Sequence, residues 1–179
     1  MFIDVYEIAE EGLRFDEIVE IPDASEDDPD RVEVARARLE GLARPGKRGV
    51  DFRAHLDARV MLSCGRCLER FEQPLATDFY LVLVPDGVEF AAGESEVSRE
   101  DSALFYAPGG KADLGTIAAE QIYLNLPLKP VCRSDCLGLC PTCGVNRNGI
   151  ECGCRREEID PRLAPLLDFK KRKGGDRTA

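Results

Sequence analysis

The sequence is poor in the residue types that enzymes use most often for proton transfer. It contains one histidine, His55, and no tryptophan among 179 residues. His55 falls on the polar side of an alternating segment, so we interpret it as a surface residue rather than a general base. No H-E-x-x-H, G-x-S-x-G or G-x-x-x-x-G-K-[ST] motif occurs. We therefore expect a non-enzymatic protein with no catalytic residue and no small-molecule substrate.

Long hydrophobic runs are also missing. The longest, FYLVLVP at residues 79–85, is far shorter than the roughly 20 residues that a membrane-spanning helix needs. The N-terminal MFIDVYEIAEEG lacks the basic segment of a secretory signal. We expect a soluble, cytoplasmic protein with no membrane partner. In a reducing compartment, clustered cysteines favour metal or redox chemistry over structural disulfides.

Basic residues are scarce in two stretches, which carry most of the net charge of −10. Residues 1–30 hold twelve acidic residues and one base, Arg14, and residues 86–101 hold six acidic residues and one base. We interpret 1–30 as an acidic arm and 86–101 as a solvated loop. The parts that carry the cysteines are mildly basic. Charge alone does not point to a nucleic-acid partner.

Two segments have the alternation of strands with one buried face. In DFRAHLDARVMLS the apolar positions are Phe52, Ala54, Leu56, Ala58, Val60 and Leu62. In FEQPLATDFYLVLVP they are Leu75, Thr77, Phe79, Leu81 and Leu83. A short loop, SCGRC, separates the two segments. We predict an antiparallel pair with cysteines at its turn.

DLGTIAAEQIYLNLP, residues 113–127, is the best helix candidate. Asp113 is a suitable N-cap, and Pro127 ends the pattern. The N-terminal MFIDVYEI and GLRFDEIVEI have weaker strand patterns. RVEVARARLEGL is compatible with either strand or helix, and residues 86–112 read as irregular.

The predicted fold class is α+β: mainly an antiparallel β-sheet with a packing helix and a C-terminal cysteine-rich zinc-knuckle module. We divide the chain into residues 1–126 (acidic arm, sheet and helix), 127–158 (cysteine-rich metal-binding module) and 159–179 (C-terminal helix and basic KKRK tail). One integrated domain is expected from all three parts.

Four of the cysteines lie in two short motifs, CPTCG and CGC. A Cys-x-x-Cys-Gly turn can present two thiolates to one metal ion, and alternate residues in an extended segment face the same way. Asn148-Gly149 between the two motifs favours a tight reversal. We predict a first four-thiolate site. Its ligands are Cys140, Cys143, Cys152 and Cys154.

The remaining cysteines suggest a second site, tied to the sheet. SCGRC lies between the two clearest strands, and Cys132 and Cys136 follow the predicted helix. If the helix packs on the sheet, the two pairs meet. The ligands would be Cys64, Cys67, Cys132 and Cys136. Two alternatives stay open: Cys132 or Cys136 could exchange into the first site, and one pair could be free of metal.

Zinc, as one or two ions, is the expected cofactor, because it suits all-sulfur coordination and contributes folding energy to a segment with little core. An iron–sulfur cluster could use the same ligands. A thiol redox function of Cys64 and Cys67 is the alternative from another class. It lacks the βαβ setting that such motifs usually have.

The cysteine motifs also support a resemblance. SCGRCLERF, followed by DLGTIAAEQIYLNLPLKPVCRSDCLGLCPTCGVNRN, CGC and DPRLAPL, resembles the YceD-like family of large ribosomal RNA subunit accumulation proteins. The likeness covers roughly residues 50–167. It implies a role in 23S rRNA accumulation and large-subunit biogenesis, with rRNA, a ribosomal protein or another assembly factor as partner. It implies no reaction, and only a metal-ligand role for the cysteines.

Basic residues flank the thiols and could meet phosphates once they have offset thiolate charge. The candidates for partner contact are Arg66, Arg70, Lys129, Arg133, Arg147, Arg155 and Arg156. The module has no Phe, Tyr or Trp, so base stacking is not supported there. A generic zinc-dependent interaction scaffold is a further alternative, and for each base alone an ordinary solvated or ion-paired side chain is the simplest interpretation.

Overall fold

The computed structural model describes residues 1–22, 32–86 and 103–154. A five-stranded sheet has the order β2-β3-β4-β5-β6, and β1 and β7 form a separate two-stranded sheet. The strands are β1 Phe2–Asp4, β2 Leu13–Ile18, β3 Glu33–Pro45, β4 Val50–Ser63, β5 Arg70–Pro85, β6 Leu104–Ala107 and β7 Lys111–Asp113. The described helix is α1, Leu114–Leu124.

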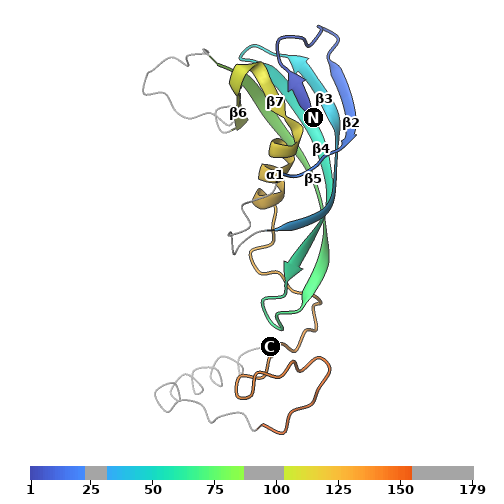
Figure 1. Ribbon diagram of the computed structural model, residues 1–179, viewed down its shortest axis with the longest axis vertical. Coiled ribbons are helices and arrows are strands. Elements are labelled where there is room, and N and C mark those ends of the chain that lie inside the picture. Colours follow the sequence, from blue (N-terminus) through green and yellow to red (C-terminus); the bar gives the residue numbers. More distant parts are fainter. Residues whose placement is uncertain (23–31, 87–102, 155–179) are drawn as a thin grey trace, which may run out of the picture.

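The predicted hairpin is confirmed as β4 and β5. The two strands pair antiparallel from Val50 opposite Leu83 to Ser63 opposite Arg70. The predicted inward positions of β4 are buried: Phe52, Ala54, Leu56, Ala58, Val60 and Leu62. Because the hairpin is so long, its turn lies far from the centre of the sheet, and the cysteines of SCGRC lie in that turn (Figure 1).

The predicted helix is confirmed as α1. The Asp113 carboxylate caps it by accepting hydrogen bonds from the Gly115 N–H at 3.4 Å and the Thr116 hydroxyl at 3.0 Å. Its buried side is Leu114, Gly115, Ile117, Ala118, Gln121 and Ile122. This side joins the sheet residues in one apolar core, so the helix covers one face of the sheet (Figure 1).

The two weaker strand patterns in the N-terminal acidic region are confirmed as β1 and β2. Residues 2–4 form β1, which pairs with β7, and residues 13–18 form β2, which pairs with β3 at the edge of the main sheet. Ile3 and Phe15 are buried, and Phe15 stacks on Phe52 with ring centroids 5.0 Å apart. The acidic side chains therefore belong to strands that a few apolar residues hold on the core.

Two other expectations need correction or completion. Residues 86–112 are not irregular throughout, because β6, the 3₁₀ turn Pro108–Gly110 and β7 lie there. β6 pairs with β5 in parallel, with Val82 opposite Leu104. The described part of the ambiguous 31–42 segment lies in strand β3 from Glu33 onward. The predicted C-terminal helix and tail, residues 159–179, lie outside the described residues.

The chain after α1 connects the core to the cysteines. Residues 127–154 leave the end of α1, run past the tip of the β4–β5 hairpin and form a small irregular unit at that end of the molecule (Figure 1). The architecture is α+β, mainly an antiparallel sheet with one described helix. It brings two cysteine pairs, 65 or more residues apart in sequence, to the same place.

Candidate metal centre

The turn between β4 and β5 is built to present two sulfurs. Cys64 and Cys67 are 0% and 4% exposed. The Leu68 N–H donates to the Cys64 carbonyl at 2.9 Å, and Leu68 has a φ of +63°, a left-handed conformation that is uncommon for a branched side chain. The Arg66 N–H points at the Cys64 Sγ at 3.4 Å. The turn therefore directs backbone N–H donors and both thiols toward one point.

The segment after α1 supplies the other two sulfurs. The Gly65 N–H donates to the Pro130 carbonyl at 2.8 Å, which fixes that segment beside the hairpin turn. The Cys64 and Cys136 Sγ atoms are 3.9 Å apart, and the Cys67 and Cys132 Sγ atoms are 3.7 Å apart. All four sulfurs lie within 4.8 Å of one another. We call this group, Cys64, Cys67, Cys132 and Cys136, the hairpin cluster.

These distances fit a shared metal ion. Four sulfurs at about 2.3 Å from a tetrahedral zinc are about 3.8 Å from each other. The two sulfur–sulfur distances, 3.7 and 3.9 Å, bracket that value. A disulfide would bring two sulfurs to about 2.05 Å, and all eight cysteines are free. The hairpin cluster thus has the spacing of a closed four-thiolate site.

The pKa shifts of the thiols in the hairpin cluster also favour a bound cation. Hydrogen bonds from the backbone N–H groups of Cys132, Cys67 and Arg66 lower the pKa of Cys64 to about 6. The side-chain amide of Asn148 lowers the pKa of Cys136. Burial, followed by its sulfur neighbours, raises the pKa of Cys132 to about 12. Four adjacent thiolates repel one another unless a positive ion lies between them, so a bound cation would allow all four to ionise.

A second group has the same turn at its start. The Gly144 N–H donates to the Cys140 carbonyl at 2.9 Å, and Gly144 has a φ of +73°. The bond and the left-handed residue repeat those of Cys64 and Leu68, with glycine at the left-handed position. The sulfurs of Cys140, Cys143, Cys152 and Cys154 lie within 4.8 Å of one another. We call these four residues the C-terminal cluster.

The C-terminal cluster is more open to solvent than the hairpin cluster. Cys140 is 5% exposed, Cys152 is half-buried and Cys143 is exposed. Hydrogen bonds from the backbone N–H groups of Cys143 and Thr142 lower the pKa of Cys140 to about 6. The contact with the Cys143 thiol raises the pKa of Cys154 to about 12. One thiol pKa is lowered and another is raised, so this group of thiols also needs a cation to ionise completely.

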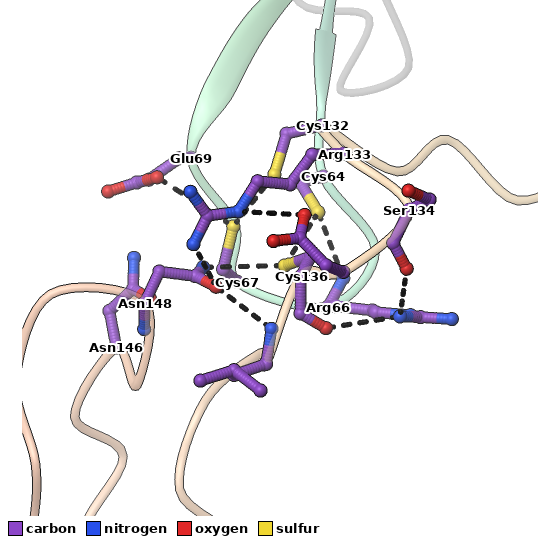
Figure 2. A network of polar contacts seen from close by, with 12 residues as sticks. Cys64, Arg66, Cys67, Glu69, Cys132, Arg133, Ser134, Cys136, Asn146 and Asn148 are labelled. Carbon is purple, nitrogen blue, oxygen red and sulfur yellow. Dashed lines mark hydrogen bonds and ion pairs between the residues drawn. The ribbon is translucent and has the colours of Figure 1, made fainter.

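The structure brings together both predicted ligand sets, with no exchange of Cys132 or Cys136 between them. One residue that contacts a predicted ligand was missed. Asn148 was interpreted only as part of a turn, yet its side-chain amide lies 3.3 Å from the Cys136 Sγ (Figure 2). The Asn-Gly dipeptide indicates a reversal, and nothing in its spacing from the cysteines points to a donor for sulfur.

The basic residues proposed for partner contact have different surroundings. The Arg66 guanidinium donates to the carbonyls of Ser134 and Cys136 at 3.5 and 3.1 Å. Arg70 forms an ion pair with Glu33, and Arg133 donates to Asn148 at 3.0 Å.

Lys129 and Arg147 are the proposed bases whose side chains have no ion pair or hydrogen bond within residues 1–22, 32–86 and 103–154. Arg155 and Arg156 lie outside the described residues.

His55 behaves as a surface residue with an acidic partner. It lies on the open face of β4, and its Nδ1 is 2.7 Å from the Asp78 carboxylate. That hydrogen bond raises the pKa of His55. A shallow depression of about 1020 Å³ runs across strands β2 to β5 and includes Arg14, Arg53, His55 and Tyr80. No helix in the part of the chain that the structure describes is long and apolar enough to cross a bilayer.

Comparisons with curated proteins give relatives for most of the chain. It is 50% identical over 123 residues to uncharacterized protein Rv2926c of Mycobacterium tuberculosis, covering 68% of this chain and 56% of the relative. It is 27% identical over 133 residues to large ribosomal RNA subunit accumulation protein YCED homolog 1, chloroplastic, of Arabidopsis thaliana, covering 63% and 41%. It is 24% identical over 173 residues to uncharacterized protein YlbN of Bacillus subtilis, covering 93% of each.

The chain spans about half the length of the first two of these relatives, 56% and 41%. No solved structure matches it. The family described as Large ribosomal RNA subunit accumulation protein YceD matches residues 52–170, which contain both cysteine clusters. Because this match covers more than half of the chain, the protein belongs to the YceD family.

Proposed function

We propose that each cluster holds one zinc ion and that both ions are structural. The observation that carries this is the geometry of the hairpin cluster. Its four sulfurs lie within 4.8 Å of one another, two pairs are at tetrahedral spacing, three of the cysteines are buried, and N–H donors point at the sulfurs. Four thiolates fill a tetrahedral zinc, so no position stays open for water or substrate. The ion would supply a cross-link rather than a reaction. Zinc is preferred to an iron–sulfur cluster because a cross-link needs no redox change.

The proposed role of the protein is to support accumulation of large-subunit ribosomal RNA as a non-enzymatic biogenesis factor in the cytoplasm. The family membership supports the process. The closed thiolate sites and the surface position of the single histidine support a role without catalysis. The two ions would hold residues 127–154 as a rigid unit at the hairpin tip, and this unit would dock on the partner.

Ribosomal RNA is the partner that the module best supports, ahead of a ribosomal protein or another assembly factor. Lys129 and Arg147 have no intramolecular ion pair in the described residues, so their charge remains available for phosphates. By contrast, Arg66 and Arg133 are engaged in holding the module together. Replacing Lys129 or Arg147 by Glu should weaken RNA binding and lower its salt dependence without zinc loss.

The proposed function is tested by depletion of the protein in its host, followed by measurement of the ratio of large- to small-subunit rRNA. The ratio should fall, and the intact chain should restore it. Cys64→Ser combined with Cys140→Ser should not restore it, whereas Ser134→Ala, which alters a module side chain outside both clusters, should. An unchanged ratio after depletion would reject the role. Co-sedimentation with large-subunit precursors separates it from a generic zinc scaffold.

The thiol redox alternative is less well supported. A redox Cys-x-x-Cys pair needs an accessible low-pKa thiol, and although the pKa of Cys64 is about 6, its side chain is fully buried. Both cysteines also have a sulfur neighbour from the other chain segment. Rapid alkylation of Cys64 or Cys67 in the native, metal-loaded protein would revive the redox interpretation.

A further inference from the structure

Asn148 belongs by sequence to the C-terminal cluster, because it lies in the loop between Cys143 and Cys152. Its side chain nevertheless reaches the hairpin cluster. The Nδ2 group donates to the Cys136 Sγ at 3.3 Å, as Figure 2 shows. The loop of one cluster thus provides a hydrogen-bond donor for a sulfur of the other.

The amide of Asn148 is fixed at both ends. Its Oδ1 accepts hydrogen bonds from the Leu137 N–H at 2.8 Å and from the Arg133 guanidinium at 3.0 Å. The backbone N–H of Asn148 donates to the Asn146 Oδ1 at 3.0 Å. Because two donors meet the oxygen, the NH₂ end must face Cys136. The side chain is therefore oriented, not merely adjacent.

Backbone contacts reinforce the connection. The Arg147 N–H donates to the Gly138 carbonyl at 2.9 Å, and the Leu139 N–H donates to the Arg66 carbonyl at 2.9 Å. The linker between the clusters therefore lies between the hairpin turn and the loop of the C-terminal cluster. Gly138 has a φ of +71°, and a Cβ there would lie 2.9 Å from the Arg66 carbonyl oxygen. The close approach needs glycine at this position.

We propose that Asn148 is a positioning residue that couples the two clusters, so that metal binding at the C-terminal cluster strengthens metal binding at the hairpin cluster. The inference rests on the proposed zinc sites. A metal ion that joins Cys140 and Cys143 to Cys152 and Cys154 fixes both ends of the loop, and the fixed loop holds the amide on Cys136. Coupling free energy is reciprocal, so filling the hairpin cluster strengthens the C-terminal cluster equally.

The test is a zinc titration of the full chain against a competing chelator. Each cluster should give one zinc-binding step, which we call the hairpin step and the C-terminal step. Cys143→Ser leaves only the hairpin cluster complete, and Cys67→Ser leaves only the C-terminal cluster complete, so these variants show which step belongs to which cluster. Asn148→Asp keeps the acceptor oxygen but loses the donor, and Asn148→Ala removes both without adding charge. Asn146→Asp makes the same charge change two positions away while keeping the acceptor for the Asn148 N–H. It is the matched control.

Loss of the outer hydrogen bond to a metal ligand typically weakens metal binding by about 10- to 100-fold. We expect that loss at the hairpin step for both Asn148 variants, and little change for Asn146→Asp. Cys143→Ser should also weaken the hairpin step, by less, because the backbone bonds of the loop remain. Combining it with Asn148→Asp should add nothing to Asn148→Asp alone.

Any of three results would overturn the coupling. The first is zinc affinity at the hairpin cluster within twofold of wild type in both Asn148 variants, and the second is additive effects in the combined variant. The third is zinc affinity at the hairpin cluster unchanged by Cys143→Ser. Far-UV circular dichroism of each variant reports whether the sheet is intact, and a variant that loses it is replaced by Asn148→Ser. A wild-type chain that binds no zinc would instead reject the proposed metal sites, so the two failures are distinguishable.

Discussion

The hairpin cluster should contribute more to stability than the C-terminal cluster, and Cys67→Ser compared with Cys143→Ser tests this. A metal ion in the hairpin cluster joins positions 65 residues apart, Cys67 and Cys132. In the C-terminal cluster it joins Cys143 to Cys152, which are nine positions apart. Each cross-link restricts the unfolded chain, and the longer loop loses more entropy when it is closed.

The size of the difference follows from loop length. By analogy with a disulfide, closing a loop of about 65 residues stabilises by about 4.3 kcal/mol, and closing one of about nine residues by about 2.6 kcal/mol. The difference of about 1.7 kcal/mol corresponds to about 3–7 °C in melting temperature for a chain of this size. Burial acts in the same direction, because Cys67 is 4% exposed and packs on Phe71, while Cys143 is exposed.

The assay is thermal unfolding of both serine variants and of the wild type, with zinc and with a chelator in excess. With zinc, Cys67→Ser should melt below Cys143→Ser. With chelator, the wild type should lose most of its advantage over both. Equal melting temperatures for the two variants would refute the loop-length reasoning, and a wild-type melting temperature that the chelator leaves unchanged would refute the cross-link itself.

Three smaller predictions concern the backbone and two titrating groups. Leu68→Gly removes the strain of a left-handed conformation at a residue with a branched side chain, so the variant should still bind zinc. Its free energy of unfolding in urea should be unchanged or up to about 1 kcal/mol higher, whereas Gly144→Val should lose about 1–2 kcal/mol. Asp113→Ala should lose about 1 kcal/mol of helix capping in the same assay. Burial raises the pKa of Asp113, but hydrogen bonds from Thr116 and Gly115 outweigh it and hold this pKa below its usual range. The capping contribution should therefore be present above about pH 4 and be lost as the pH falls below that. The hydrogen bond to Asp78 raises the pKa of His55. A small stabilisation, under about 1 kcal/mol, should therefore be full below about pH 6.5 and disappear as the pH rises through the folded pKa. NMR titration of the imidazole ring checks the pKa, and His55→Gln should remove the pH-dependent stabilisation.

The elements that the sequence predicts well have strong local patterns. The six alternating apolar residues from Phe52 to Leu62 indicate β4, and Asp113 followed by an apolar stripe indicates α1. The ligand sets follow from spacing, because Cys-x-x-Cys fixes two sulfurs on one side of a turn. The hairpin cluster also requires the helix to return the chain to the hairpin, which is a tertiary event that only the packing of α1 provides.

The elements that the sequence predicts only weakly or not at all depend on distant contacts. Acidic residues dominate the first 30 positions, so Ile3 and Phe15, the apolar residues that hold β1 and β2, give these strands only weak patterns. β6 and β7 have four and three residues, too few for any alternation to show. Asn148 acquires its role from the close approach of two loops, which spacing along the chain does not encode.

The most direct measurement is zinc per chain in protein purified under reducing conditions, for the wild type, Cys64→Ser, Cys140→Ser and the double variant. Two four-thiolate sites predict two ions in the wild type, about one in each single variant and none in the double variant. A wild-type chain without zinc, or single variants that keep both ions, would contradict the account.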